Sequence, residues 1–360
     1  MDGNSRVLQE VAAASDERLA ALARAGRWRD YEGPELDEFS GLLRDEFEQQ
    51  EVKLCASGTG AVELALRGLQ VKADDQVLLA GYDFPGNFRA IEAVGARPLL
   101  IDLEEQQWVA SLPEGAHTAK AVIVSPLYGS LPPMDRWRKW CDQHGVFLLL
   151  DACQCPGARY APPGEPAKPL STWADATCLS FGGSKILTAG RGGAVLTNSA
   201  ANLARMNRYT DRGNDLSPLS LLQAAALIPQ LERLEEANRY RSALISELDC
   251  LATSFPCLQD PMLGDAIGSG VRVHYKKAWL VADLELRDRL LSACLGQQIP
   301  LGEGFRGFLR RTSRRCTSVD DLCNSLRASQ QTILLHHGYL VAEEPAARID
   351  ELRGFFSRFS

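Results

Sequence analysis

The stretch Cys178-Leu-Ser-Phe-Gly-Gly-Ser-Lys185-Ile-Leu-Thr-Ala-Gly-Arg-Gly-Gly193 decides how this chain is interpreted. Its lysine lies in a glycine-rich connection between two apolar runs, 176–181 and 194–197, which are typical of buried strands. Glycines mark turns and close backbone approach. A partly buried lysine can lose its proton and act as a nucleophile, above all in forming a Schiff base. The stretch alone fits such a reactive Lys185 and an ordinary surface-loop lysine equally well.

The totals of the chain indicate a soluble enzyme with two packed units. Its 360 residues exceed one small core, and 45% hydrophobic with 24% charged residues are ordinary proportions for a globular protein. A net charge of −7 argues against a nucleic-acid partner. No apolar run reaches transmembrane length and the N-terminus does not resemble a signal peptide. We therefore expect a cytoplasmic protein without a membrane partner.

The cysteines predict neither disulfides nor a metal site. All ten are scattered along the chain, which favours reduced thiols in a cytosolic protein. Cys153 and Cys155 lie two apart, but no second pair and no histidines follow at ligand spacing. Zinc is therefore not expected.

The turn Ser57-Gly-Thr-Gly60 follows a short apolar strand and begins a helix that runs to about Leu69. Backbone N–H groups at a helix N-terminus, with small residues that allow approach, form an anion site. Gly58 and Thr59 are thus candidates to hold a phosphate. Threonine is also common as an ordinary helix cap, so both interpretations stay open at this point.

Strands alternate with helices through the first half of the chain, with strands expected at 76–80, 98–102, 121–125 and 146–150. This rhythm predicts an α/β fold with a doubly wound, largely parallel sheet. In such sheets the site lies beyond the carboxyl ends of the strands. Asp151, Thr59 and Phe84 fall there. Asp151 would cap a turn or bind a metal or a cationic ligand atom, Gln154 can face the same cleft, and Phe84 would line it or pack in the core.

The second half predicts a connector and a smaller α/β unit. A long helix is expected from about 218 to 248, followed by a strand at 271–281 and helices at 283–296, 317–328 and 342–358. We divide the chain into an N-terminal helical arm (1–27), a large domain (28–240) and a small domain (241–360). The patch Arg306, Arg310, Arg311, Arg314 and Arg315 fits a solvated helix face or an anion-binding wall.

These pieces, in this order, resemble the pyridoxal-phosphate aminotransferases of fold type I, and more narrowly the DegT/StrS sugar aminotransferase family. The resemblance covers residues 28–240 well and the remainder loosely. It rests on three segments in register, which are Ala56-Ser-Gly-Thr-Gly-Ala-Val-Glu-Leu-Ala-Leu66, Asp151-Ala-Cys-Gln154, and Ser180-Phe-Gly-Gly-Ser-Lys185 with Gly190-Arg-Gly-Gly193. It implies a large domain with a mostly parallel sheet flanked by helices and a smaller C-terminal domain.

The resemblance also implies roles for the candidate residues. Lys185 would hold the cofactor aldehyde as an internal aldimine and then move a proton during transfer. Asp151 would pair with the pyridine nitrogen and keep it protonated, which makes the ring an electron sink. Gln154 would bond the ring hydroxyl and Phe84 would stack on the ring. The remaining candidates, which would hold the phosphate, are Gly58, Thr59 and Ser180.

The chain departs from the family pattern at several positions. Gly182 stands where a histidine is frequent, and Ser57 stands where asparagine usually precedes Gly-Thr. The family's Gly-x-Asn-x-Arg segment, whose asparagine reaches the partner subunit's phosphate, is not preserved. Asn214 is a candidate for that contact, although the pattern expects Leu216. The resemblance implies a homodimer with active sites at the interface.

We therefore expect an aminotransferase that moves an amino group from glutamate or glutamine to a keto-sugar or a related biosynthetic ketone. A dehydratase-like enzyme is an alternative, but relatives that dehydrate replace the lysine by histidine. A sensor that binds the cofactor or an amino-sugar is another, which the retention of Lys185, Asp151 and Gln154 disfavours. An oxidoreductase ranks last, because no Gly-x-Gly-x-x-Gly follows the first strand.

Overall fold

The computed structural model describes residues 3–114, 118–211, 215, 217–261, 269–297, 299–341 and 345–359. Within them an eight-stranded sheet has the strand order β1-β9-β8-β5-β4-β2-β3-β13. The pairs from β8 to β13 are parallel, whereas β9 runs antiparallel to both β8 and β1. The largely parallel sheet predicted from the sequence is confirmed. Its strands are β1 (Glu51–Cys55), β2 (Gln76–Ala80), β3 (Arg97–Ile101), β4 (Ala121–Val124), β5 (Phe147–Asp151), β8 (Ala176–Ser180), β9 (Gly193–Thr197) and β13 (Thr317–Ser318).

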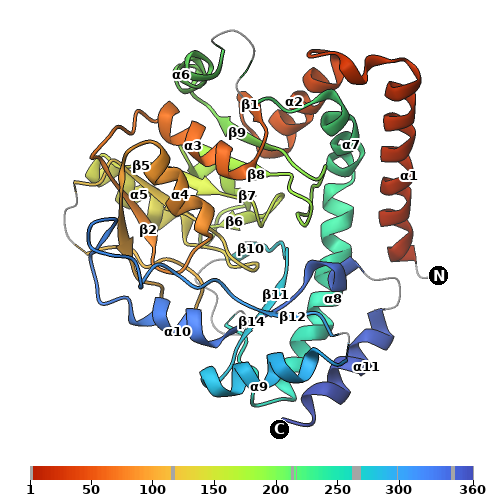
Figure 1. The fold of residues 1–360 in the computed structure, drawn as a ribbon, viewed down its shortest axis with the longest axis vertical. Helices are drawn as coiled ribbons and strands as arrows, with labels where there is room; N and C mark the ends of the chain where they lie inside the picture. Colours follow the sequence, from red (N-terminus) through yellow and green to blue (C-terminus); the bar gives the residue numbers. More distant parts are fainter. Residues whose placement is uncertain are drawn as a thin grey trace.

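Helices cover both faces of this sheet, as Figure 1 shows. In β2, Leu78 and Ala80 face one core while Val77 and Leu79 face the other, because successive side chains of a strand point to opposite faces. The first core includes side chains of α2 (Pro34–Phe47), α5 (Met134–His144) and α7 (Leu221–Glu232). The second includes side chains of α3 (Gly58–Gly68), α4 (Pro85–Ala93) and α6 (Ala200–Thr210). A strand apolar on both faces must be covered on both, which gives the three layers.

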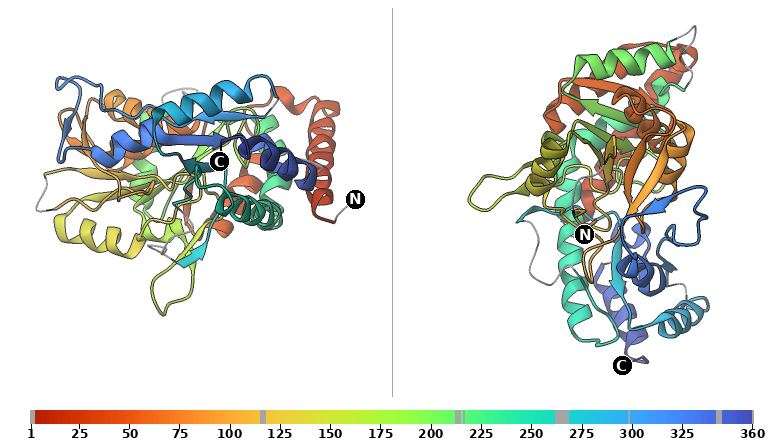
Figure 2. Two further views of the ribbon diagram at one scale, coloured as in Figure 1. Left: turned by 90° about the horizontal axis from the view of Figure 1, so that it is seen from below. Right: turned by 90° about the vertical axis from the view of Figure 1, so that its left-hand side faces the viewer.

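The prediction of one long helix at 218–248 is wrong, because this region forms two helices. α7 ends at Glu232 and α8 (Leu234–Thr253) follows, with Arg233 between them at φ −111°. Pro229 lies inside α7, where its ring removes one backbone hydrogen bond and strains the turn before it. α1 (Gly3–Arg24) packs along α7 at the side of the molecule (Figures 1 and 2). A short 3₁₀ turn, η1 (Arg27–Arg29), leads from α1 towards α2.

The C-terminal part builds a core of its own around the three-stranded sheet β11-β14-β12. α8 contributes Leu234 to the first core of the large sheet. Its residues from Leu244 onwards belong to the core of the C-terminal part. The domain boundary at 240–241 stays a prediction. The elements of this part are β11 (Lys277–Leu280), α9 (Leu284–Cys294), β12 (Leu301–Glu303), α10 (Cys323–Gln331), β14 (Thr332–Leu335), η3 (His337–Val341) and α11 (Pro345–Phe356).

Two expected elements of this part differ from the structure. The helix expected at 317–328 begins only at Cys323, and residues 317–318 form β13, which extends the large sheet beside β3. The strand expected at 271–281 is interrupted. Its first piece, β10 (Ser269–Val271), pairs with β6 (Arg159–Ala161) in a second small sheet that also contains β7 (Lys168–Pro169). The 3₁₀ turn η2 (Leu170–Trp173) follows β7.

The ten cysteines are free thiols in the structure. Across the described ranges, no group of three or more cysteine, histidine, aspartate and glutamate side chains is arranged to hold a metal ion. Nor does any helix in that part of the chain have the length and apolarity needed to span a membrane.

Candidate active site

The candidate residues meet at the carboxyl-end edge of the central sheet. Asp151 is the last residue of β5 and lies opposite Cys178 of the parallel strand β8, whose last residue is Ser180. Ser180 in turn lies opposite Gly193, at the start of β9. Because β5 and β8 are parallel neighbours, their ends bring Asp151 and Ser180 to one edge of the sheet.

Asp151 is 6% exposed and accepts hydrogen bonds from neutral donors. Asn87 Nδ2 donates to its Oδ2 at 2.8 Å, and the Cys153 backbone N–H donates to its Oδ1 at 3.0 Å. No cationic side chain of the described residues forms an ion pair with it. A buried carboxylate with only neutral partners is well placed to receive a cationic ligand atom.

Lys185 is half-buried and points towards aromatic rings from distant segments. Its Nζ lies 4.5 Å from the ring centre of Tyr275 and 5.9 Å from that of Phe84. Burial and the nearby Asp151 raise the pKa of the Cys153 thiol well above its usual value, and Lys185 opposes this shift. The Phe84 ring near Lys185 and the Asn87 amide on Asp151 both belong to the N-terminal end of α4, so Lys185 and Asp151 face a common region.

Gly58, Thr59 and Ser180 form a cradle at the N-terminus of α3. The helix cap is Ser57, whose Oγ accepts from the Gly60 N–H at 3.0 Å. This leaves the N–H groups of Gly58 and Thr59 without an acceptor in the part of the chain that the structure describes. A Cβ on Gly58 would lie only 2.6 Å from Ser180 Cβ, so this position requires glycine. The cradle suits a phosphate, which accepts such N–H bonds.

Phe84 and Gln154 complete the candidate set. Phe84 is 39% exposed, so its ring is available to a ligand and is not simply core packing. It lies over Gly86, where a Cβ would approach both the Phe84 ring and Thr59 Oγ1 within 2.7 Å. Gln154 is buried and its Oε1 accepts from the Tyr128 N–H at 3.3 Å. Its amide nitrogen has no acceptor among the described residues and remains available to a ligand hydroxyl.

The sequence interpretation missed several residues that lie at this site. Tyr275 bonds Ser184 through their hydroxyl groups at 2.6 Å, although the two are far apart in sequence. Phe305 packs against Phe84 at 5.9 Å between ring centres and stacks on Tyr128 at 6.0 Å. The sequence offers no local signal for Tyr275 and Phe305, because their neighbours come from other segments.

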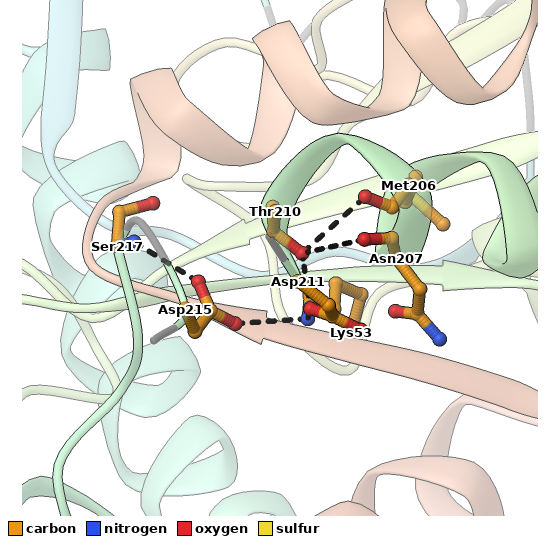
Figure 3. A network of polar contacts seen from close by, with 7 residues as sticks. All are labelled: Lys53, Met206, Asn207, Thr210, Asp211, Asp215 and Ser217. Carbon is orange, nitrogen blue, oxygen red and sulfur yellow. Dashed lines mark hydrogen bonds and ion pairs between the residues drawn. The ribbon is translucent and has the colours of Figure 1, made fainter. Parts of the chain in front are cut away.

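The segment that would carry the cross-subunit contact is only partly described. Asn214 and Leu216 lie outside the described residues, so the candidate contact of Asn214 stays a prediction. On either side of that gap, Lys53 Nζ binds Asp211 Oδ1 at 3.1 Å and Asp215 Oδ2 at 2.9 Å, as Figure 3 shows. Lys53 of β1 therefore binds one side chain before residues 212–214 and one after them.

The arginine patch is not a helix face, because residues 306–315 form turns and extended chain. Arg315 pairs with Glu92 at 2.5 Å, and Arg306 pairs with Glu303 at 3.2 Å. Arg306, Arg310 and Arg311 line a cavity of about 450 Å³ together with Arg287 of α9. The interpretation as a solvated helix face is therefore wrong, and an anion-binding wall stays a prediction.

The residues present fit pyridoxal phosphate. A glycine cradle with free N–H groups suits its phosphate, and a buried carboxylate without a cationic partner suits a protonated ring nitrogen. A half-buried lysine amine faces the same region and is the group that an aldehyde requires. Each of these three chemical requirements is met by a different element of the fold.

Comparison with known sequences agrees with this geometry. The sequence model of the DegT/DnrJ/EryC1/StrS aminotransferase family matches residues 9–351. An L-glutamine:2-deoxy-scyllo-inosose aminotransferase of Streptoalloteichus tenebrarius is 31% identical over 255 residues, covering 62% of this chain and 59% of that relative. A dTDP-3-amino-3,4,6-trideoxy-alpha-D-glucose transaminase of Streptomyces venezuelae is 31% identical over 255 residues, covering 66% and 65%. The chain thus spans less than two thirds of the length of these relatives.

Solved structures show the same fold. DesV of S. venezuelae, solved in complex with a ketimine intermediate, superposes with a TM-score of 0.81 at 25% identity, over 97% of this chain and 96% of that chain. The 3-amino-5-hydroxybenzoic acid synthase superposes with a TM-score of 0.81 at 22% identity, over 96% and 97%. The fold and the cofactor class predicted from the sequence are therefore confirmed. With the family match over nearly its whole length, the chain belongs to the DegT/DnrJ/EryC1/StrS aminotransferase family.

Proposed function

We propose that this protein is a pyridoxal-phosphate-dependent aminotransferase that transfers an amino group from an amino acid to a ketone of a sugar or cyclitol. The observation that carries the proposal is the convergence of Lys185, Asp151 and the Gly58–Thr59 cradle around the N-terminal end of α4, at one edge of the sheet. The remaining site residues supply groups of the right chemistry around that centre.

Pyridoxal phosphate supplies an aldehyde that joins to amines and a ring that accepts electrons when its nitrogen is protonated. The Asp151 carboxylate, whose plane is set by Asn87 and the Cys153 N–H, would accept a hydrogen bond from the protonated ring nitrogen and keep the proton on that nitrogen. Gly58, Thr59 and Ser180 would bind the phosphate through N–H and hydroxyl donors. Gln154 would donate to the ring hydroxyl, and Phe84 would cover one ring face. These contacts orient the ring and exclude water from that face.

Lys185 would act as nucleophile and as base. Its amine would take the cofactor aldehyde in the resting enzyme and, once released, would move the proton at the carbon that carries the amino group of the donor. Tyr275 and Ser184 lie beside it, with the Tyr275 ring 4.5 Å from Nζ. This contact limits the directions in which the amine can reach.

The names of the relatives support the proposed acceptor class. Those at 31% identity are named for a cyclitol ketone, an amino-sugar linked to dTDP, and a 3-oxo sugar acid linked to UDP. Their shared feature is the six-membered ring of a sugar or cyclitol. We propose the same for this chain, with glutamine or glutamate as the donor.

We also propose a homodimer. Tyr31 is 81% exposed and Trp28 is 57% exposed, which is unusual for large aromatic side chains on a monomer. Tyr31 lines a hollow of about 750 Å³ that also contains Lys53 and Pro218. Aromatic residues are enriched at protein interfaces. Light scattering coupled to size exclusion should give twice the chain mass, and Tyr31→Asp should lower it.

The test of the activity begins with the purified protein and added cofactor. We expect a visible absorption band that borohydride abolishes, with the reduced cofactor found on Lys185 by peptide mass spectrometry. Glutamine or glutamate should convert this band, and a panel of keto-cyclitols and nucleotide-linked keto-sugars should restore it. Restoration by one member of the panel would identify the acceptor. No borohydride-sensitive band under any condition would refute the proposal.

The same assay separates the two alternatives. A sensor would show the band without conversion by any amino donor. A dehydratase-like enzyme would release water from its substrate without passing nitrogen to it, which isotope-labelled glutamine would reveal. Lys185 favours transfer over dehydration, because the base that moves the proton is present.

A further inference from the structure

A second buried carboxyl group, that of Asp83, lies beside Asp151 and takes no part in the chemistry proposed above. Asp83 is 1% exposed. It follows β2, as Ser125 follows β4 and Asp151 ends β5. β2, β4 and β5 are adjacent parallel strands, so their carboxyl ends bring these three side chains to the same edge of the sheet.

A continuous hydrogen-bond network joins the two carboxyl groups. Ser125 Oγ donates to Asp83 Oδ2 at 2.8 Å, and the Phe84 N–H donates to Asp83 Oδ1 at 2.6 Å. Asn87 Nδ2 donates to Asp151 Oδ2 at 2.8 Å and lies 3.2 Å from Ser125 Oγ and 3.4 Å from Asp83 Oδ1. An amide nitrogen carries two hydrogens. One serves Asp151, and the other is shared between Ser125 and Asp83, which fixes the rotation of the amide.

We propose that Asp83 is a positioning residue of the reaction site, which holds the Asn87 amide on Asp151 and the Phe84 backbone beside it. The proposal rests on the proposed role of Asp151 as the partner of the ring nitrogen. Asp151 receives one donor on each oxygen, Asn87 on Oδ2 and the Cys153 N–H on Oδ1. These two donors set the plane of the carboxylate, so losing one would let it turn away from the ring nitrogen.

Asp83 contacts two residues that would act on different parts of the cofactor ring, Asn87 and Phe84. Through Asn87 it acts on the carboxylate at the ring nitrogen. Through the Phe84 N–H it fixes the residue that begins α4 and whose side chain would cover the ring face. Phe84 caps α4 without a side-chain hydrogen bond, and its backbone is held by Asp83 at the N–H and by the Asn87 N–H, which donates to its carbonyl at 3.0 Å.

The protonation of Asp83 is compatible with this role. Burial and the charge of Asp151 together raise the pKa of Asp83 to about 8, against the hydrogen bonds from Phe84, Ser125 and Asn87, which lower it. The other titratable groups that it faces are the hydroxyls of Tyr82 and Tyr128, whose own pKa values are raised by burial. Because a hydroxyl both donates and accepts, the Ser125 contact persists in either protonation state of Asp83.

The test compares Asp83→Leu with Asp83→Asn in the full-length protein loaded with pyridoxal phosphate that carries a heavy nitrogen isotope in the ring. The nitrogen chemical shift reports whether the ring nitrogen is protonated, independently of turnover. Asp83→Leu should move the nitrogen shift towards the unprotonated value and weaken cofactor binding about tenfold. It should lower kcat while changing KM by a smaller factor. Asp83→Asn keeps the hydrogen-bond acceptor. It should therefore leave the nitrogen shift at the wild-type value, and the cofactor affinity and kcat within about threefold of the wild type.

Two controls keep the outcomes distinct. Leu290→Ala, a buried substitution in the C-terminal core, should lower the unfolding midpoint without moving the nitrogen shift. Asn87→Leu should reproduce the effect of Asp83→Leu, and it tests the network if Asp83→Leu fails to fold. An unchanged shift and cofactor affinity in either leucine variant would overturn the role of Asp83.

The failure of the proposed function looks different. In that case Asp151→Asn itself would leave the nitrogen shift and the activity unchanged, and the inference about Asp83 would fall with it. If Asp151→Asn moves the shift but Asp83→Leu and Asn87→Leu do not, the function stands and only the inference is refuted.

Discussion

Two buried groups of ionisable side chains in this protein differ in how their charge is balanced. In the C-terminal core, Lys277 is 1% exposed and pairs with Asp249 at 2.5 Å and with Asp260. We call these three residues the C-terminal cluster. At the edge of the large sheet, Asp83 and Asp151 meet only neutral donors from Asn87, Ser125 and the backbone. We call these four side chains the reaction-site cluster.

The comparison shows how a structural cluster differs from a binding site. In the C-terminal cluster, burial raises the pKa of Asp249, but the charge of Lys277 lowers it, so both carboxylates contact a cation of the chain itself. In the reaction-site cluster, burial and the second carboxylate act in the same direction on Asp83. A buried carboxylate without a cation is costly unless a ligand supplies the positive charge. The reaction-site cluster therefore indicates where a cationic ring nitrogen would bind.

The largest expected effect is on activity and comes from Lys185. Lys185→Ala should lower kcat by a factor on the order of 10³ or more, since it removes both nucleophile and base. It should leave the unfolding midpoint within about 2 °C, because the side chain is half-buried and makes no ion pair among the described residues. Initial rates and thermal unfolding measure the two effects. Lys72→Ala on the surface is the matched control, and a Lys185→Ala rate within about threefold of the wild type would contradict the assignment.

The C-terminal cluster should give the opposite result. Lys277→Met removes the ammonium group that bonds both Asp249 and the buried Asp260 side chain, which should lower the free energy of unfolding by about 3–5 kcal/mol. The kcat of the folded fraction should change by less than about threefold. Denaturant unfolding and rate measurements below the unfolding midpoint would show this.

A compensated variant sharpens this prediction. Lys277→Met combined with Asp249→Leu and Asp260→Leu should recover part of the lost stability, because the two carboxylates that bonded Lys277 are then removed, whereas Arg272 loses its attraction to them. A loss below about 1 kcal/mol in the single variant, or no recovery in the triple variant, would show that the cluster is not held by charge pairing.

The reaction-site cluster should make stability depend on pH. The pKa of Asp83 is 3.8 in its ordinary environment and about 8 in the fold, so the folded state binds the proton more tightly. The resulting stabilisation is complete below about pH 4 and is lost as the pH rises through about 8. Asp83→Asn removes this group and should be more stable than the wild type above pH 8, by on the order of a few kcal/mol. Equal stability of the two proteins from pH 6 to about 10 would contradict this.

The smallest effect is expected at Lys53, whose ion pairs are partly exposed. The Asp211 and Asp215 side chains are 50% and 26% exposed, so solvent screens both pairs. A hydrogen bond from Thr210 and the contact with Lys53 lower the pKa of Asp211. Lys53→Met should lower the free energy of unfolding by only about 1 kcal/mol. High salt should reduce the difference from the wild type, and a loss as large as that of Lys277→Met would contradict the comparison.

Most of the large domain was predictable because its signals are local. The strands at 76–80 and 146–150 follow from apolar runs within a few residues, and the helix that runs to about Leu69 follows from the turn before it. The sequence placed Asp151 and Phe84 beyond strand ends, and the rule for parallel sheets then brought them to one edge. The sequence singled out Lys185, Gly58 and Thr59 as candidates because each lies in a turn with its own glycine pattern.

The errors lie where distant segments overrode local preference. Residues 317–318 read as the start of a helix but pair with β3, since an edge of the large sheet was free to accept another strand. The expected strand at 271–281 is interrupted around Tyr275, which turns to Ser184 across a separation of 91 residues. Asp83 is adjacent in sequence to the candidate Phe84, but its proposed positioning role depends on contacts with Asn87 and, through it, with Asp151. Only the folded sheet brings these side chains together.

The sequence by itself determined the α/β class, the lysine between two buried strands, the acid at the end of β5 and the glycine turn before α3, because periodicity, burial and turn chemistry are written in neighbouring residues. Only the tertiary structure decided that Tyr275 and Phe305 line the site and that Asp83 stands behind Asp151. These contacts join residues that follow separate strands and that lie far apart in the sequence. Their partners are chosen by packing, which no local pattern records.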